Sequence, residues 1–147
     1  MTTTKLYAAY GSNLNLKQMA VRCPDAVPVS TAVLEGWQLT FRGVATLERC
    51  EGSRTPVGIW GLTSQCETAL DRYEGYPRLY RKEMIEVLVK GKRQPVMLYL
   101  MNEGMPSMPS KWYLDAIAQG YADVGLDTKY LDGALLHTKK MIEGARK

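Results

Sequence analysis

Apolar and polar residues alternate over much of the first 101 residues, which is the period of a half-buried strand. The clearest alternations predict strands at residues 5–10, 29–34, 37–41, 57–62, 85–89 and 95–101. Lys90-Gly91-Lys92 is a suitable turn between the last two, which are therefore a predicted hairpin. Glu51-Gly52-Ser53 predicts a loop before the strand at 57–62.

A period of three to four residues replaces this alternation most clearly over residues 64–74. Ser64 and Glu67 match the S-x-x-E capping box at the start of this predicted helix. Gly75 is suited to end it, because glycine adopts the left-handed conformation that closes many helices. Glu74 is therefore expected on the last turn of the helix.

The last third of the chain carries two more helical periods, one over 110–125 and one that begins at 127 or 128. A shorter helix, capped by Asn13 or Asn15, is predicted before Cys23-Pro24. Strands come mostly first and helices mostly last. This order favours an α+β fold over a repeating βαβ sheet.

The composition limits the chemistry that the chain can perform. There is one histidine, His137, and no CxxC or HExxH spacing, so we expect neither a zinc site nor any other metal site. A Ser-His or Cys-His nucleophile would need His137, which we expect to be solvated on the polar side of the last helix. Carboxylates, tyrosines and backbone amides must then carry any catalysis, without a cofactor.

Length and charge place further bounds on the protein. The 147 residues predict a single domain, 1–147. The net charge of +4 is scattered along the chain, which disfavours a nucleic-acid partner. The longest apolar run, 96–101, is far shorter than a membrane span, and three widely spaced cysteines fit reduced thiols. We therefore expect a cytoplasmic protein with no membrane partner.

Residues 7–14, Tyr-Ala-Ala-Tyr-Gly-Ser-Asn-Leu, form a predicted strand that runs into a tight turn and a helix. Glycine and small polar residues allow consecutive backbone N–H groups to point outward there. The start of the following helix adds positive potential. This arrangement suits a carboxylate or a developing oxyanion; the alternative is an ordinary corner between strand and helix.

Residues 70–77, Leu-Asp-Arg-Tyr-Glu-Gly-Tyr-Pro, close the clearest helix. The negative end of the helix dipole disfavours a charged carboxylate at Glu74. Partial burial among Tyr73, Tyr76 and Tyr80 would raise its pKa further, into the range useful for proton transfer near neutral pH. The alternative is an exposed glutamate at a fraying helix end.

The chain resembles the γ-glutamylcyclotransferase family, also called AIG2-like, in two of these segments. They are Tyr-Gly-Ser-Asn-Leu at 10–14 and, further along the chain, Leu-Asp-Arg-Tyr-Glu-Gly at 70–75. Residues 43–46 and 57–62 look like the middle strands of the family. Tyr80, Tyr99 and the run 109–113 also fall where the family has such residues. The similarity extends from Leu6 to Tyr130.

The resemblance implies an α+β fold with a small mixed β-barrel, flanking helices and a pocket at one end of the barrel. It also implies that the catalytic glutamate of the family is Glu74. The substrate-binding residues implied are Tyr7, Ala8, Ala9, Tyr10, Gly11, Ser12, Asn13, Tyr80, Tyr99 and Tyr113.

The implied reaction is cyclisation of a small γ-glutamyl substrate to 5-oxoproline with release of the attached amine. The sequence does not distinguish a γ-glutamyl amino acid from a γ-glutamylamine, or a monomer from a homodimer. The alternative function is a non-catalytic domain that binds a small molecule on the same barrel.

Overall fold

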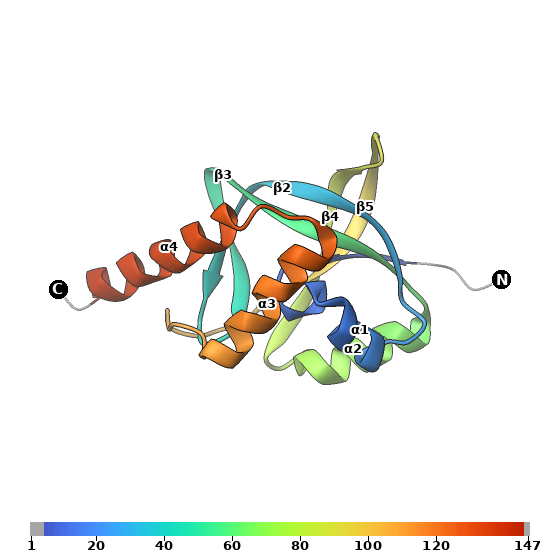
Figure 1. Cartoon of the computed structure of the whole chain (residues 1–147), viewed down its shortest axis with the longest axis horizontal. Helices are drawn as coiled ribbons and strands as arrows, with labels where there is room; N and C mark the ends of the chain where they lie inside the picture. Colours follow the sequence, from blue (N-terminus) through green and yellow to red (C-terminus); the bar gives the residue numbers. More distant parts are fainter. Residues whose placement is uncertain (1–4, 146–147) are drawn as a thin grey trace.

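The computed structural model describes residues 5–145 and contains a mixed sheet of five strands in the order β2-β3-β1-β5-β4 (Figure 1). The strands are β1 (Lys5–Ala9), β2 (Val27–Phe41), β3 (Ala45–Leu62), β4 (Tyr80–Val89) and β5 (Lys92–Met101). The central strand β1 is antiparallel to β3 and parallel to β5. The predicted α+β class is therefore confirmed.

The sheet does not close, so the expected barrel is an open, curved sheet. The edge strands β2 and β4 contact each other, but no ladder of hydrogen bonds joins them within residues 5–145. A groove of about 850 Å³ separates them, with Val33, Trp37, Met84 and Leu88 among its lining side chains.

The strands β2 and β3 form a longer hairpin than the sequence pattern indicates. The two strands expected at 29–34 and 37–41 are one strand, β2, irregular at Gly36, whose φ is 82°. The loop expected at Glu51-Gly52-Ser53 lies inside β3. Residues 50–53 have no register partner on β2, so this glycine-containing segment is an irregular bulge opposite Gly36.

The helices are α1 (Leu16–Arg22), α2 (Ser64–Glu74), α3 (Lys111–Val124) and α4 (Lys129–Ala145), with a 3₁₀ helix, η1 (Ser12–Leu14). Asn15 caps α1 by accepting a hydrogen bond from the Gln18 N–H. The cap of α2 is Thr63, whose Oγ1 accepts from the Cys66 N–H, so the capping box expected from Ser64 is wrong by one residue.

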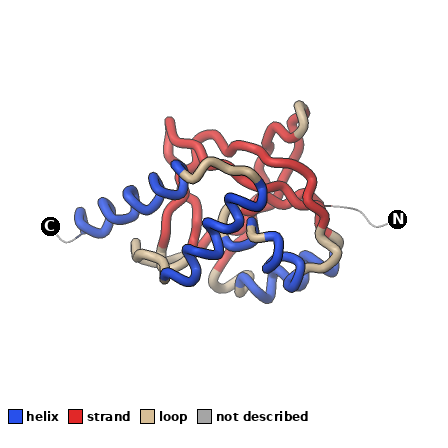
Figure 2. Tube along the Cα trace, in the orientation of Figure 1, coloured by secondary structure: helices blue, strands red, loops and turns tan. Residues whose placement is uncertain are grey.

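Close packing of α3 fixes the position of η1 beside the sheet. A Cβ atom at Gly120 would lie 2.7 Å from the backbone of Leu14 and Asn15, so only glycine allows this approach. The helices α1, α2 and α3 lie together on one side of the sheet, while α4 packs on β2 and its C-terminal end projects beyond the sheet (Figures 1 and 2). No helix within residues 5–145 has the length and apolar character needed to span a membrane.

The last helix, α4, packs on β2 and is tethered at His137. The imidazole Nε2 lies 2.9 Å from Glu48 Oε1 on β3, and one third of the side chain is exposed. The predicted solvated histidine is therefore only partly exposed, because α4 lies against the hairpin of β2 and β3.

Candidate active site

Eight of the predicted substrate-binding residues and Glu74 come together around one small cavity. It is lined by Tyr7, Tyr10, Gly11, Ser12, Asn13, Ala45, Glu74, Tyr80, Tyr99 and Tyr113. These residues come from four strands, the first turn, α2 and α3, so no local segment could form the site alone. The cavity volume is about 20 Å³, the space of roughly one water molecule. A larger ligand therefore requires the surrounding side chains to move apart.

Two predicted residues, Ala8 and Ala9, do not line the cavity. Both are fully buried in β1, where they pair with Ile59 and Gly58 of β3. Alternation along the strand places Ala8 on the face opposite Tyr7, and Ala9, although on the same face as Tyr7, is completely covered by its neighbours. Their role is to pack the centre of the sheet.

Glu74 is the last residue of α2 and its carboxylate faces the first turn of the chain. The helix ends at the next residue because Gly75 adopts a φ of 70°. The amide nitrogen of Asn13 donates to Glu74 Oε1 at 3.2 Å and to the Tyr7 hydroxyl at 2.8 Å. The first turn and the end of α2, 61 residues apart, therefore meet through one asparagine side chain.

Burial raises the pKa of Glu74 to about 7. The positive charge of Arg22 and the hydrogen bond from Asn13 act in the opposite direction but do not outweigh burial. The neighbours differ from those expected: Tyr80 lines the cavity, whereas Tyr73 and Tyr76 are exposed. A carboxyl with a pKa near neutrality can exchange a proton in both directions at physiological pH.

Three tyrosines that line the cavity donate hydroxyl hydrogen bonds to neighbouring protein groups. Tyr80 donates to the carbonyl oxygen of Ala45 at 2.6 Å, and Tyr10 donates to the carbonyl oxygen of Tyr99. Tyr99 donates to Asp71 Oδ1 at 2.7 Å, so its hydroxyl points toward Asp71. Burial raises the pKa of each of these hydroxyls, which keeps them neutral.

Two other tyrosines keep a hydroxyl hydrogen for a ligand. The oxygen of Tyr7 accepts from Asn13, and the oxygen of Tyr113 accepts from the N–H of Ala45 at 3.1 Å. Within residues 5–145 neither hydroxyl has an acceptor for its own hydrogen. The N–H groups of Ser12 and Asn13, at the start of η1, have none there either. The cavity therefore combines hydrogen-bond donors with one protonatable carboxylate.

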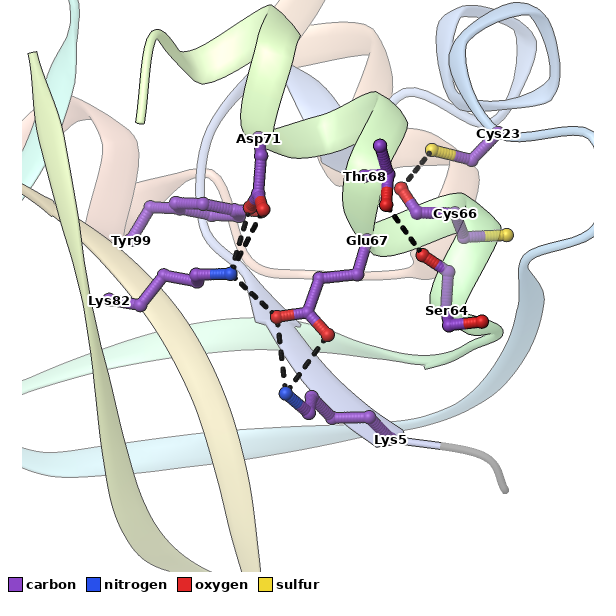
Figure 3. Close-up of polar contacts among 9 residues, drawn as sticks. All are labelled: Lys5, Cys23, Ser64, Cys66, Glu67, Thr68, Asp71, Lys82 and Tyr99. Atoms are coloured by element: carbon purple, nitrogen blue, oxygen red, sulfur yellow. Dashed lines mark hydrogen bonds and ion pairs between the residues drawn. The ribbon is translucent and has the colours of Figure 1, made fainter. Parts of the chain in front are cut away.

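Residues beyond those predicted also support the site. Asp71 accepts from Tyr99 and forms an ion pair with Lys82, with Asp71 Oδ1 at 3.0 Å from the lysine Nζ (Figure 3). Asp71 precedes Glu74 by three residues, so helical spacing could have indicated that they share a face. Arg22, which contacts the turn, carries no recognisable sequence signal.

Comparisons with known proteins identify the family of the chain. The model of the family described as "Gamma-glutamyl cyclotransferase, AIG2-like" matches residues 7–118. The chain is 30% identical over 141 residues to the γ-glutamylcyclotransferase of Mus musculus, covering 86% of this chain and 75% of the mouse protein. The Homo sapiens protein of the same name is also 30% identical, with 85% and 74% covered.

A solved structure named "Gamma-glutamyl cyclotransferase" superimposes on this fold with a TM-score of 0.79 and 25% sequence identity. The superposition covers 95% of this chain and 86% of the other. The segment matched by the family model includes the first turn, Glu74 and Tyr113, which are the parts that meet at the cavity. On the sequence match and the shared fold together, this chain belongs to the γ-glutamyl cyclotransferase, AIG2-like, family.

Proposed function

We propose that the protein is a γ-glutamylcyclotransferase that converts a γ-glutamyl amino acid or γ-glutamylamine to 5-oxoproline, with Glu74 as general acid and base. One observation carries the proposal. A partly buried carboxyl with a pKa of about 7 shares a cavity with backbone and hydroxyl donors, and the substrate offers matching groups. Its γ-carbonyl and α-carboxylate accept hydrogen bonds, and its α-ammonium needs a carboxylate.

The bond changes take place within the substrate. Its α-amine attacks its own γ-carbonyl carbon, a C–N bond forms to close a five-membered ring, and the original amide C–N bond breaks. No protein nucleophile is required, which agrees with the single histidine of the chain. Holding the two groups in attacking geometry can contribute about 7 kcal/mol or more toward lowering the barrier.

Glu74 moves the protons. In its ionised form it takes a proton from the α-ammonium, which frees the amine to attack. In its protonated form it then delivers a proton to the leaving nitrogen as the amide bond breaks. The second proton that the ring nitrogen loses also goes to the released amine, so the amine leaves as an ammonium ion. General acid–base steps of this kind typically contribute about 10²–10⁴-fold.

The donors of the cavity have a role at the carbonyl oxygen. Charge develops on this oxygen as the amine adds, and the N–H groups of Ser12 and Asn13 and the Tyr113 hydroxyl are free to donate to it. Loss of one such donor typically costs about 10²–10³-fold. The small cavity volume means that substrate binding displaces the cavity tyrosines.

The test is product formation from a panel of γ-glutamyl amino acids and γ-glutamylamines, followed as 5-oxoproline by mass spectrometry. We expect turnover of at least one substrate by the natural chain and loss of turnover in Glu74→Gln. Absence of product from every substrate, or full activity of Glu74→Gln, would contradict the proposal. Substrate binding without turnover by either protein would instead favour a non-catalytic binding domain.

A further inference from the structure

Arg22, the last residue of α1, is held in a single arrangement beside the cavity. Its Nη2 donates to Gln18 Oε1 at 2.6 Å, and its Nη1 donates to Asn13 Oδ1 at 2.7 Å and to Ser12 Oγ at 3.3 Å. The guanidinium carbon lies 3.8 Å from the centre of the Tyr73 ring. Four neighbours thus fix the planar guanidinium, and two of them belong to the turn that lines the cavity.

The contact to Asn13 determines which way its side-chain amide faces. A guanidinium only donates hydrogen bonds, so the atom of Asn13 that meets Arg22 has to be the oxygen. The NH₂ group must then face the other side, where it donates to Glu74 Oε1 and to the Tyr7 hydroxyl. A chain of hydrogen bonds therefore runs from Arg22 through Asn13 to Glu74.

We propose that Arg22 is a positioning residue for the cyclisation, acting through Asn13 to hold the Glu74 carboxylate against the first turn. The proposal rests on the function proposed above, since it concerns the same acid–base group. Arg22 does not line the cavity, and its role is to orient Asn13 and to supply the positive charge that lowers the pKa of Glu74.

The charge of Arg22 acts on a carboxylate that is otherwise surrounded by neutral groups. Burial raises the pKa of every tyrosine of the cavity, so these side chains carry no charge near neutral pH. The ring of Tyr73, the residue before Glu74 on α2, is partly exposed and stacks on the Arg22 guanidinium. Arg22 therefore favours the ionised form of Glu74, the form that accepts the proton from the substrate amine.

Three variants separate the charge of Arg22 from its hydrogen-bonding geometry. Arg22→Gln removes both, and we expect kcat to fall about tenfold or more, with a smaller change in KM. The acid limb of the kcat profile should also move to higher pH, because the Glu74 carboxyl loses the positive charge that lowers its pKa. Arg22→Lys keeps a positive charge but loses the planar set of guanidinium hydrogen-bond donors. We therefore expect kcat to fall while the acid limb of the kcat profile stays near its original pH.

A double-mutant cycle tests the route through Asn13. If Arg22 acts by orienting that amide, Arg22→Gln in an Asn13→Ala background should lower kcat by much less than it does alone. Arg72→Gln is the matched control, because Arg72 is an exposed arginine of α2 two residues from Glu74. It removes the same formal charge and should leave kcat and its pH profile unchanged.

The outcomes distinguish this proposal from the function on which it rests. Full activity of Glu74→Gln would overturn the proposed function itself. An inactive Glu74→Gln together with wild-type kcat and pH profiles for Arg22→Gln and Arg22→Lys would overturn only the role of Arg22. Additive losses in the double mutant would overturn the route through Asn13. Should Arg22→Gln fold poorly, Arg22→Lys, which keeps the cation over Tyr73, still decides between these outcomes.

Discussion

Two glutamates of the same helix have opposite environments. Glu67 and Glu74 lie seven residues apart on α2, about two helical turns, and so on the same face. Glu67 contacts Lys82 at 2.7 Å and Lys5 at 2.9 Å (Figure 3). Glu74 has Asn13 as its hydrogen-bond donor and Arg22 as a more distant cation.

The difference shows what decides proton affinity at these positions. Burial acts to raise the pKa of both carboxyls, but at Glu67 the hydrogen bonds and charges of Lys82 and Lys5 outweigh it and lower the pKa. At Glu74 burial dominates and the pKa rises to about 7. A carboxylate that contacts two cations stabilises the fold. A partly buried carboxylate without such contacts gains proton affinity at a cost in stability.

The largest expected contrast is in activity. Glu74→Gln should lower kcat/KM by about 10²–10⁴-fold, because the carboxyl proposed to transfer the protons is removed. Glu67→Gln is the control. Its kcat/KM should stay within about threefold of the value for the natural chain, since Glu67 lies two helical turns from Glu74. Steady-state formation of 5-oxoproline measures both. Equal losses in the two variants would mean that the helix, and not Glu74, is what the reaction needs.

The second contrast is in stability against pH. In the natural chain Glu74 has a pKa of about 7 when folded and about 4.5 when unfolded, so the unfolded state binds fewer protons between these values. The free energy of unfolding should therefore fall by about 3 kcal/mol as pH rises through this window. Glu74→Gln should lack this loss, and denaturation at pH 5 and pH 8 compares the two proteins.

Glu67 should show the reverse dependence. The pKa of Glu67 is lowered in the folded state. The contribution of Glu67 to the free energy of unfolding is therefore present above its unfolded pKa and disappears as pH falls through its folded pKa. Glu67→Gln should cost about 1 kcal/mol at neutral pH and less in acid or in high salt. Lys82 keeps its ion pair with Asp71 in this variant, which limits the loss. A cost that grew toward acid pH would contradict the assignment.

The smallest effect concerns the two tyrosines whose hydroxyls point in different directions. The hydroxyl of Tyr99 donates a hydrogen bond to Asp71, whereas the hydroxyl hydrogen of Tyr113 is free for a ligand. Tyr99→Phe should therefore lower kcat/KM less than Tyr113→Phe does, and should cost about 1 kcal/mol of stability for the lost hydrogen bond. The reverse ranking in the same assay would show that Tyr99 turns its hydroxyl toward the substrate.

Local sequence patterns were sufficient for the parts of the fold that depend on neighbours in the chain. The period of α2, the glycine that ends it and the hairpin turn at Lys90-Gly91 all depend on backbone preferences within a few residues. The cap at Thr63 in place of Ser64 shows the limit of such patterns. Glu67, which the capping box would have used, is instead bound by lysines from β1 and β4.

The sequence by itself determined that Glu74 lies at a helix end next to Gly75, and that chemistry must come from carboxylates, tyrosines and backbone amides. Only the tertiary structure decided which tyrosines surround Glu74, that Asn13 and Arg22 reach it, and that the sheet stays open. The physical reason is that burial and charge at a site depend on groups from distant segments. The pattern of residues along the chain indicates helices and strands. It does not give the distances between these elements, and those distances determine the pKa of a side chain.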